Sequence, residues 1–204
     1  MRSALRIVRS AFRIWWDNLV HMTFFNTLWI LAQFLIITGP PATAAMYALT
    51  VQFMERDLIV PKDFFLALKS MFLPAWKWGA LNILIFAILV MNFAGSIFQE
   101  GEIWFCLRGI WIVMGILWYI LNLFYWPLWL SEHDQRLINT YRNSLVMLLR
   151  MPMLVITISV ISAVLIVASI VLLFPLALAL MVWLSLIGML TVQLAIKEVI
   201  QQGE

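Results

Sequence analysis

Thr38-Gly39-Pro40-Pro41-Ala42-Thr43-Ala44-Ala45 interrupts an apolar run that otherwise extends from residue 19 to residue 54. Tandem prolines lack backbone N–H donors and push the preceding residues away from helical conformation, so a helix must end here. Pro41 can open the next helix, because a proline in the first turn loses no helical hydrogen bond. The alanines that follow give this second helix a smooth surface, which allows close helix approach in lipid. We therefore predict a short helix enclosed by the other helices of a bundle.

The composition is typical of an integral membrane protein. Of the 204 residues, 65% are hydrophobic and 11% are charged, far from the balance of a soluble domain. No polar stretch is long enough for a separate aqueous domain, so we predict one membrane domain over residues 1–204. Basic residues outnumber acidic ones by three but are spread between apolar segments. This pattern favours anionic lipid headgroups as their partners and argues against nucleic acid.

Six apolar segments predict an all-α, polytopic transmembrane bundle. They are residues 19–37, 41–54, 78–98, 103–130, 152–173 and 175–196. Segment 41–54 would rise only ~21 Å as a helix, whereas a hydrocarbon core is about 30 Å thick. It therefore lies sunk among other helices, crosses a thinned region, or forms a re-entrant hairpin with segment 19–37.

Three amphipathic helices with basic polar faces accompany these segments. The first covers residues 1–18, the second opens at Pro61 and extends toward Lys77, and the third follows residue 135. We expect all three to lie on the cytoplasmic face of the membrane. The residues of the predicted cytoplasmic basic face are Arg2, Arg6, Arg9, Arg13, Lys62, Lys69, Arg136 and Arg142.

The positions of lysine and arginine predict the orientation. If the short segment counts as a crossing, this basic face and Arg56, Lys77, Arg150 and Lys197 fall on one side of the membrane, and only Arg108 falls on the other. The positive-inside rule then places both termini in the cytoplasm. Five crossings would break this pattern, so the charge asymmetry favours six.

A weak internal repeat agrees with this division. Arg9-Ser10-Ala11-Phe12, Lys69-Ser70-Met71-Phe72 and Arg142-Asn143-Ser144-Leu145 each lie in a basic amphipathic helix that precedes a pair of apolar segments. The repeat unit would be a surface helix plus a hairpin, over residues 1–54, 62–130 and 135–196. Chance similarity in a biased composition is the alternative interpretation.

Three blocks of the sequence resemble the YesL-like family of bacterial membrane proteins. They are residues 38–46, Asp63-Phe64-Phe65-Leu66-Ala67-Leu68-Lys69, and residues 125–152 with Tyr125-Trp126-Pro127-Leu128 and Arg142-Asn143-Ser144-Leu145. The order and spacing agree, but Pro40 stands where the family usually has glycine. The resemblance implies a multi-pass protein of the bacterial inner membrane without established activity or catalytic residues. Its relatives often occur beside carbohydrate uptake systems.

Residue types that carry chemistry are sparse. The only histidines are His21 and His133, and the only cysteine is Cys106. Glu132-His133-Asp134 could hold a metal weakly, but metal sites require several convergent ligands, and we interpret these residues as a helix start. No glycine-rich phosphate loop, metal-binding cysteine pair or nucleophile elbow appears. We therefore expect no catalytic residues, no metal, no cofactor and no enzymatic activity.

The helix break is one candidate binding site. Discontinuous helices bind substrates in many transporters. The candidate residues here are Thr38, Gly39, Pro40, Pro41 and Thr43.

An aromatic stripe is a second candidate surface. Trp104, Trp111, Trp118 and Tyr125 recur every seven residues, so they share one helix face with a drift of only ~20° per heptad. Two interpretations stand: the stripe packs within the bundle or against lipid, or it contacts a hydrophobic cofactor or a partner helix.

Two functions follow from these features. We favour a non-enzymatic accessory or interaction subunit of a membrane complex, since the amphipathic helices offer binding surface while no catalytic set is evident. Its partners would be the lipid bilayer and other membrane subunits, or a second copy of the chain. A small-solute transporter with a site at the break is the alternative.

Cysteine labelling can test the predicted orientation in a protein that carries the substitution Cys106→Ser. We expect a cysteine near Glu100 to react with a membrane-impermeant reagent from outside, whereas cysteines at Lys69 and Asn139 stay protected, because the basic segments remain inside. Equal outside labelling at Lys69 would overturn the topology.

Overall fold

The chain is helical throughout the part that the computed structural model describes, residues 2–55 and 59–203, and no strand occurs in these ranges. Within them, the side chains of residues 2, 174–178 and 199–203 are not described. The elements are α1 (Arg2–Asp17), α2 (Leu19–Phe34), the 3-10 helix η1 (Ile36–Thr38), α3 (Gly39–Glu55), α4 (Pro61–Ser70), α5 (Phe72–Ile97), α6 (Glu102–Ser131), α7 (Leu137–Arg150), α8 (Pro152–Leu172) and α9 (Phe174–Gly203).

Each predicted segment corresponds to a helix, with differences at the ends. The segment predicted as residues 19–37 ends as α-helix α2 at Phe34, and an extended Leu35 leads into the 3-10 helix η1. The short helix α3 begins at Gly39, not at Pro41, because both prolines fit in a first turn, where the N–H groups have no helical partner. The second amphipathic helix ends at Ser70 and is separated from α5 by Met71. Pro74 explains this end, since it lacks the N–H that would bind the Ser70 carbonyl in a continuous helix.

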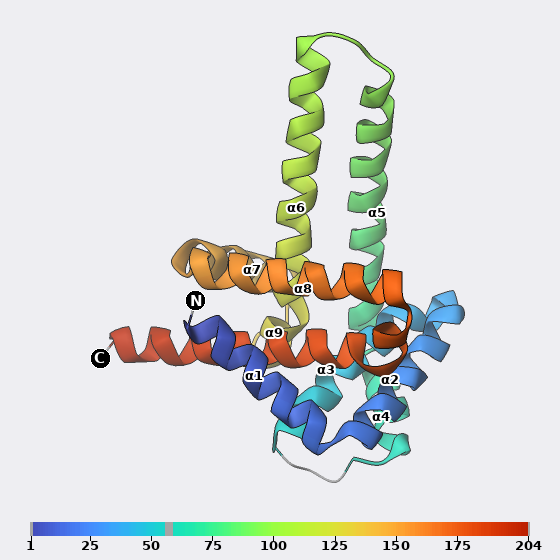
Figure 1. Ribbon diagram of the computed structural model, residues 1–204, viewed down its shortest axis with the longest axis vertical. Helices are drawn as coiled ribbons and strands as arrows, with labels where there is room; N and C mark the ends of the chain where they lie inside the picture. The colour runs from blue at the N-terminus through green and yellow to red at the C-terminus, as the bar shows by residue number, and fades with distance from the viewer. Residues whose placement is uncertain (1, 56–58, 204) are drawn as a thin grey trace.

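Helix α3 lies inside the molecule, as its small residues predict. It contacts α2, α4, α5, α6 and α9, and the ribbon shows it within the group of helices at the base of the molecule (Figure 1). Polar contacts reinforce this packing: the hydroxyls of Thr50 and Ser185 lie 2.7 Å apart between α3 and α9. Asn26 of α2 accepts a 3.0 Å hydrogen bond from the Met181 N–H of α9. The buried residues of α3 are Gly39, Pro41, Ala42, Ala44, Ala45, Met46, Tyr47, Leu49, Thr50 and Phe53.

Two glycines allow proline rings to approach neighbouring helices. A Cβ added to Gly79 of α5 would lie 3.0 Å from Cγ of Pro40, at the start of α3. A Cβ added to Gly188 of α9 would lie 2.8 Å from Cγ of Pro127 and 3.6 Å from the Leu123 carbonyl oxygen. That carbonyl lacks its usual helical donor because residue 127 is a proline. Each of these two proline rings therefore packs against a glycine, which has no side chain to clash with it.

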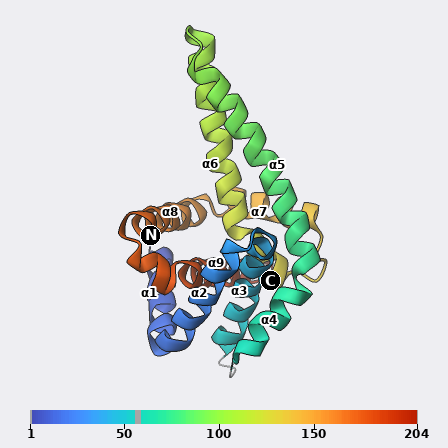
Figure 2. The same ribbon diagram turned by 90° about the vertical axis from the view of Figure 1, so that its right-hand side faces the viewer.

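Helices α5 and α6 form a long hairpin that extends away from all the other helices (Figures 1 and 2). Their tip turns at Gly101, whose φ of +112° favours glycine. Arg108 of α6 donates to the carbonyl oxygens of Ser96, Ile97 and Gln99 at 3.0, 3.4 and 3.2 Å. These groups lie at the C-terminal end of α5, where carbonyls lack helical partners and the helix dipole attracts cations. Arg108, the exception to the charge pattern, therefore caps a helix end.

Four helices in the described ranges are long and apolar enough to cross a membrane: α5, α6, α8, and residues 179–198 of α9. Helix α2 is apolar but shorter. These features support a membrane protein. Figure 1 shows that α8 and α9 run across the direction of the α5–α6 hairpin, so the four do not share one axis. The count of six crossings therefore stays a prediction of the charge pattern.

The glycine contacts predict a stability difference between two alanine substitutions. Gly188→Ala should lower the thermal midpoint of the purified protein, because the new methyl group meets a rigid ring, and such overpacking costs about 1–3 kcal/mol. Gly115→Ala in α6 is the control, since nothing lies within 4 Å of its added Cβ, and alanine is the better helix former. If both variants melt alike, the close contact does not limit the packing.

Candidate functional site

Helices α5, α6 and α7 meet at the base of the hairpin in a cluster of aromatic and amide side chains. Helix α7 lies against the end of α6 because only residues 132–136 connect the two helices. Short connections of this kind are usual between neighbouring helices. We name this group the aromatic–amide cluster. Its members are Trp78, Asn82, Trp118, Asn122, Tyr125 and Tyr141.

Hydrogen bonds join the cluster across all three helices. Asn122 Oδ1 accepts from Trp78 Nε1 at 2.9 Å and from Tyr141 Oη at 3.0 Å. Asn82 accepts from Trp118 Nε1 at 3.0 Å, and its amide nitrogen lies 3.3 Å from Tyr141 Oη. The two amide nitrogens also bond to carbonyls one turn earlier in their own helices. Asn82 and Asn122 therefore act as interhelical packing contacts, which is a common role for amides in membrane proteins.

Ring contacts complete the cluster. Tyr141 stacks on Trp118 with centroids 4.9 Å apart, and it lies 4.9 Å from the Tyr125 ring. Burial raises the pKa of the Tyr141 hydroxyl above its ordinary value, and this effect outweighs the opposing hydrogen bond with Asn82. The hydroxyl consequently remains protonated and available as a donor at any physiological pH.

The predicted aromatic stripe of α6 divides at this cluster. Trp118 and Tyr125 contact Tyr141 of α7, so the lower half of the stripe packs within the protein. Trp104, near the tip, is exposed, and Trp111 is half-buried. The four rings therefore do not form one continuous free surface.

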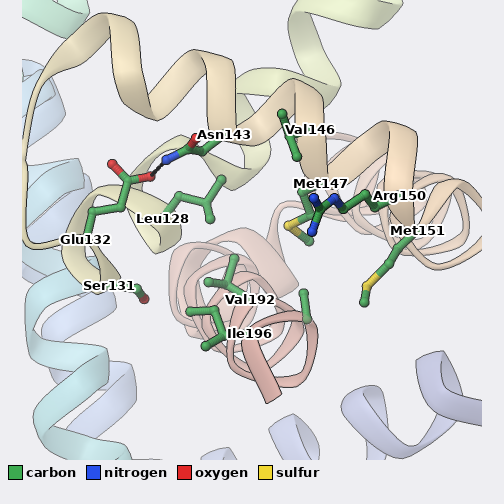
Figure 3. Close-up of a pocket in the computed structure, with 11 residues that line it drawn as sticks. Leu128, Ser131, Glu132, Asn143, Val146, Met147, Arg150, Met151, Val192 and Ile196 are labelled. Atoms are coloured by element: carbon green, nitrogen blue, oxygen red, sulfur yellow. Dashed lines mark hydrogen bonds between the residues drawn. The ribbon is translucent and has the colours of Figure 1, made fainter. Parts of the chain in front are cut away.

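A pocket opens on the other side of α7, between the end of α6, α7 and α9 (Figure 3). We name it the α7–α9 pocket. Its volume is about 300 Å³, at the low end for ligand sites. The residues around it are mostly apolar, with Glu132 and Arg150 as the charged members. The lining residues are Leu128, Ser131, Glu132, Asn143, Val146, Met147, Arg150, Met151, Val192, Ala195 and Ile196.

Glu132 is held in place by side chains of α7. Its carboxylate accepts from Asn143 Nδ2 at 2.9 Å and from Thr140 Oγ1 at 3.0 Å. We had interpreted Glu132-His133-Asp134 as a helix start, but α7 begins at Leu137 without a side-chain cap. The acidic groups instead bind α7 side chains, and Asp134 pairs with Arg136 at 3.0 Å. Within the described residues, no group of three His, Cys, Asp or Glu side chains is arranged to hold a metal ion.

The polar atoms of the helix break pair with neighbouring side chains. Thr43 accepts from Trp29 Nε1 at 3.0 Å, and the Gly39 carbonyl accepts from Gln33 Nε2 at 3.2 Å. The Thr38 hydroxyl donates to the Ala32 carbonyl at 2.7 Å. Beside the break, a pocket of about 310 Å³ is lined by Trp29, Ile30, Gln33 and Phe34. The break is thus internally satisfied, with an apolar cavity next to it.

The predicted basic face is largely exposed. Arg6 of α1 and Lys197 of α9 line one cavity of about 190 Å³ with Ser3, Ser10 and Gln193. Arg13 lies 3.9 Å from Asp17, and exposed pairs of this kind stabilise little. The Arg2 side chain and Arg56 lie outside the described part. The exposed members are Arg6, Arg9, Arg13, Lys62, Lys69, Arg136 and Arg142.

Sequence reasoning missed the residues that α7 brings to these sites. Asn143 and Arg150 line the α7–α9 pocket although neither was a candidate binding residue. Tyr141 follows the amphipathic spacing of Leu137, Leu145 and Leu148 in the sequence, which indicates an apolar face, yet its hydroxyl binds two amides. A polar tip within an apolar helix face was the available signal, because a buried tyrosine hydroxyl usually finds a partner.

Comparison with known proteins gives one match. A family model described as a protein of unknown function, DUF624, matches residues 22–93. This range includes two of the three blocks that resemble YesL-like proteins, at residues 38–46 and 63–69, whereas the third lies beyond it. No curated protein and no solved structure matches the chain significantly. The chain is therefore similar, from α2 to most of α5, to a family without known activity, and the YesL-like assignment stays a prediction.

The cluster predicts that the Tyr141 hydroxyl stabilises the protein. Tyr141→Phe keeps the ring contacts but removes the hydrogen bonds of the hydroxyl with the half-buried amides of Asn82 and Asn122. A hydrogen bond contributes about 0.5–1.5 kcal/mol, so the substitution should lower the thermal midpoint. Tyr119→Phe is the matched control, because the Tyr119 hydroxyl makes a single hydrogen bond among the described residues, to the Ser159 carbonyl at 3.1 Å. If Tyr141→Phe lowers the thermal midpoint no more than Tyr119→Phe does, the ring contacts alone hold α7 in place.

Proposed function

We propose that the protein is a non-enzymatic, membrane-embedded interaction subunit that binds a transmembrane helix of a partner protein. The surface for this contact is the exposed face of α5 in the hairpin. We name it the α5 stripe. It consists of Ala80, Leu84, Ala87, Met91, Ala94 and Phe98, all of them exposed.

The spacing of the α5 stripe is the observation that carries the proposal. Its members alternate at intervals of four and three residues, which is the seam of paired helices. Small residues at every second position let a second backbone approach closely in lipid. The larger members are free: Leu84, Met91 and Phe98 are 56%, 73% and 87% exposed. Helix α6 packs on the opposite face, where Leu89 and Ser96 are buried, so the stripe is unpartnered within the described chain.

Asn92 of α5, about a third of a turn around the helix from the centre of the stripe, supports a protein partner over lipid alone. It is exposed, and its amide nitrogen bonds to the Ile88 carbonyl at 2.7 Å. No donor among the described residues reaches its Oδ1. An amide oxygen that faces hydrocarbon is costly, and interhelical hydrogen bonds are a usual way to satisfy it.

The proposal includes the orientation and location inferred from the sequence. With the hairpin crossing the membrane, the tip around Glu100 lies outside and both termini lie in the cytoplasm, as the positive-inside rule favours for six crossings. The resemblance to YesL-like proteins suggests the bacterial inner membrane and a partner from a carbohydrate uptake system.

A small-solute transporter is the second candidate, favoured by the cavity of about 310 Å³ beside Gln33 at the break. The internal hydrogen bonds of the break weigh against it, since transporters expose such groups to the substrate. The partner proposal therefore takes precedence.

Purification in mild detergent separates the two candidates. We expect wild-type protein to retain membrane subunits that Ala87→Trp loses, because the indole blocks close helix approach. Val164→Trp on the exposed face of α8 is the control and should retain them. Both variants should remain monodisperse, since neither site is buried.

Three results would contradict the proposal. Retention of the same subunits by Ala87→Trp would exclude the stripe. A homodimer that Ala87→Trp dissociates would replace the partner by a second copy. Solute uptake by the reconstituted protein alone would support the transporter.

A further inference from the structure

The α7–α9 pocket combines an apolar interior with a free cation at its edge. Leu128, Met147, Val192 and Ile196 surround the space between α6, α7 and α9 in Figure 3. Arg150, the last residue of α7, lies over this space beside Met147 and Met151. No ion pair or hydrogen bond to the Arg150 guanidinium exists among the described residues.

The other polar groups of the pocket are already engaged. Glu132 accepts from Thr140 and Asn143, and the Ser131 hydroxyl donates to the Pro127 carbonyl at 2.8 Å. Arg150 is therefore the one charged group of this pocket, within the described chain, that has no partner. An unpaired cation beside apolar walls favours an anionic group of a ligand, and guanidinium groups bind phosphate oxygens through two parallel hydrogen bonds.

The pocket lies where the apolar segments end. Helix α6 gives way to the polar residues 131–136, and the apolar part of α9 gives way to Lys197 and Glu198. Both ends line or adjoin the same pocket. For α6, whose hairpin is proposed to cross the membrane, this transition marks the level of the headgroups, where basic pockets between helices bind lipid phosphates.

We propose that the α7–α9 pocket binds a membrane phospholipid, with the phosphate on Arg150 and the beginning of one acyl chain against Leu128, Val192 and Ile196. The volume of about 300 Å³ accommodates part of a chain, and the rest extends into the bilayer. An inorganic phosphate would leave the apolar walls uncovered, and a neutral diacylglycerol would leave the cation unpaired. This site is separate from the α5 stripe and does not depend on the proposed partner.

Native mass spectrometry of the full chain in dodecyl maltoside tests the site with three probes. Dioleoyl phosphatidylglycerol carries both the phosphate and the chains, inorganic phosphate carries only the anion, and dioleoylglycerol carries only the chains. We expect one tightly retained phosphatidylglycerol per protein and at least tenfold weaker binding of the other two, since a charge-assisted hydrogen bond is worth at least about a factor of ten.

Two arginine variants identify the residue responsible. Arg150→Gln should weaken phosphatidylglycerol binding about tenfold or more while leaving the lipid-free thermal midpoint unchanged, because Arg150 has no partner to lose. Arg142→Gln removes the same charge from an exposed position of α7 outside the pocket, and its binding should match wild type. Ala195→Phe should also weaken binding, since its ring fills the apolar space.

Each contrary outcome overturns a defined part of the proposal. Equal weakening by both arginine variants would show general attraction to a basic surface. Phosphate binding as tight as phosphatidylglycerol would remove the lipid assignment. Dioleoylglycerol binding as tight as phosphatidylglycerol would remove the role of Arg150.

Discussion

Close approach of backbones around α3 is the constraint on which the rest of the structure depends. A helix of 17 residues contacts five others, and its first half buries only glycine, proline and alanine up to Ala45. Two proline rings meet a glycine of a neighbouring helix: Pro40 meets Gly79, and Pro127 meets Gly188. Association of helices in lipid relies on such packing, since lipid chains are as apolar as the side chains.

Helix α7 connects this packed body to the hairpin. Tyr141 binds the amides of α5 and α6, while Asn143 and Arg150, further along the same helix, reach the pocket beside α9. An amphipathic helix of only 14 residues thus holds the base of α6 and lines a cavity. Loss of the Tyr141 contacts would therefore affect both the direction of the hairpin and the shape of the pocket.

The pattern of apolar and basic residues predicted the order of the described α-helices but not the 3-10 helix η1, because hydrophobic periodicity and prolines act locally. The directions of the helices were not predictable in this way. Helices α8 and α9 run across the hairpin, and no local signal encodes that angle. The candidate sites also combine features that local sequence predicts with contacts that it does not predict. The break lies at residues 35–38, just before the two prolines that predict it, and both prolines stand in the first turn of α3. The pairing of Glu132 with Asn143, or of Trp118 with Tyr141, depends instead on which helices meet in space.

The Arg108 cap at the hairpin tip has a consequence for how the hairpin enters the membrane. In the proposed orientation, which puts the tip outside, this arginine would be carried against the inside-negative membrane potential, which opposes its transfer by about 2.3 kcal/mol per 100 mV. The carbonyl groups of Ser96, Ile97 and Gln99 offset part of this cost only when α5 and α6 are already side by side. Translocation of Arg108 is therefore most favourable for the two helices together, so the hairpin should insert as a single unit.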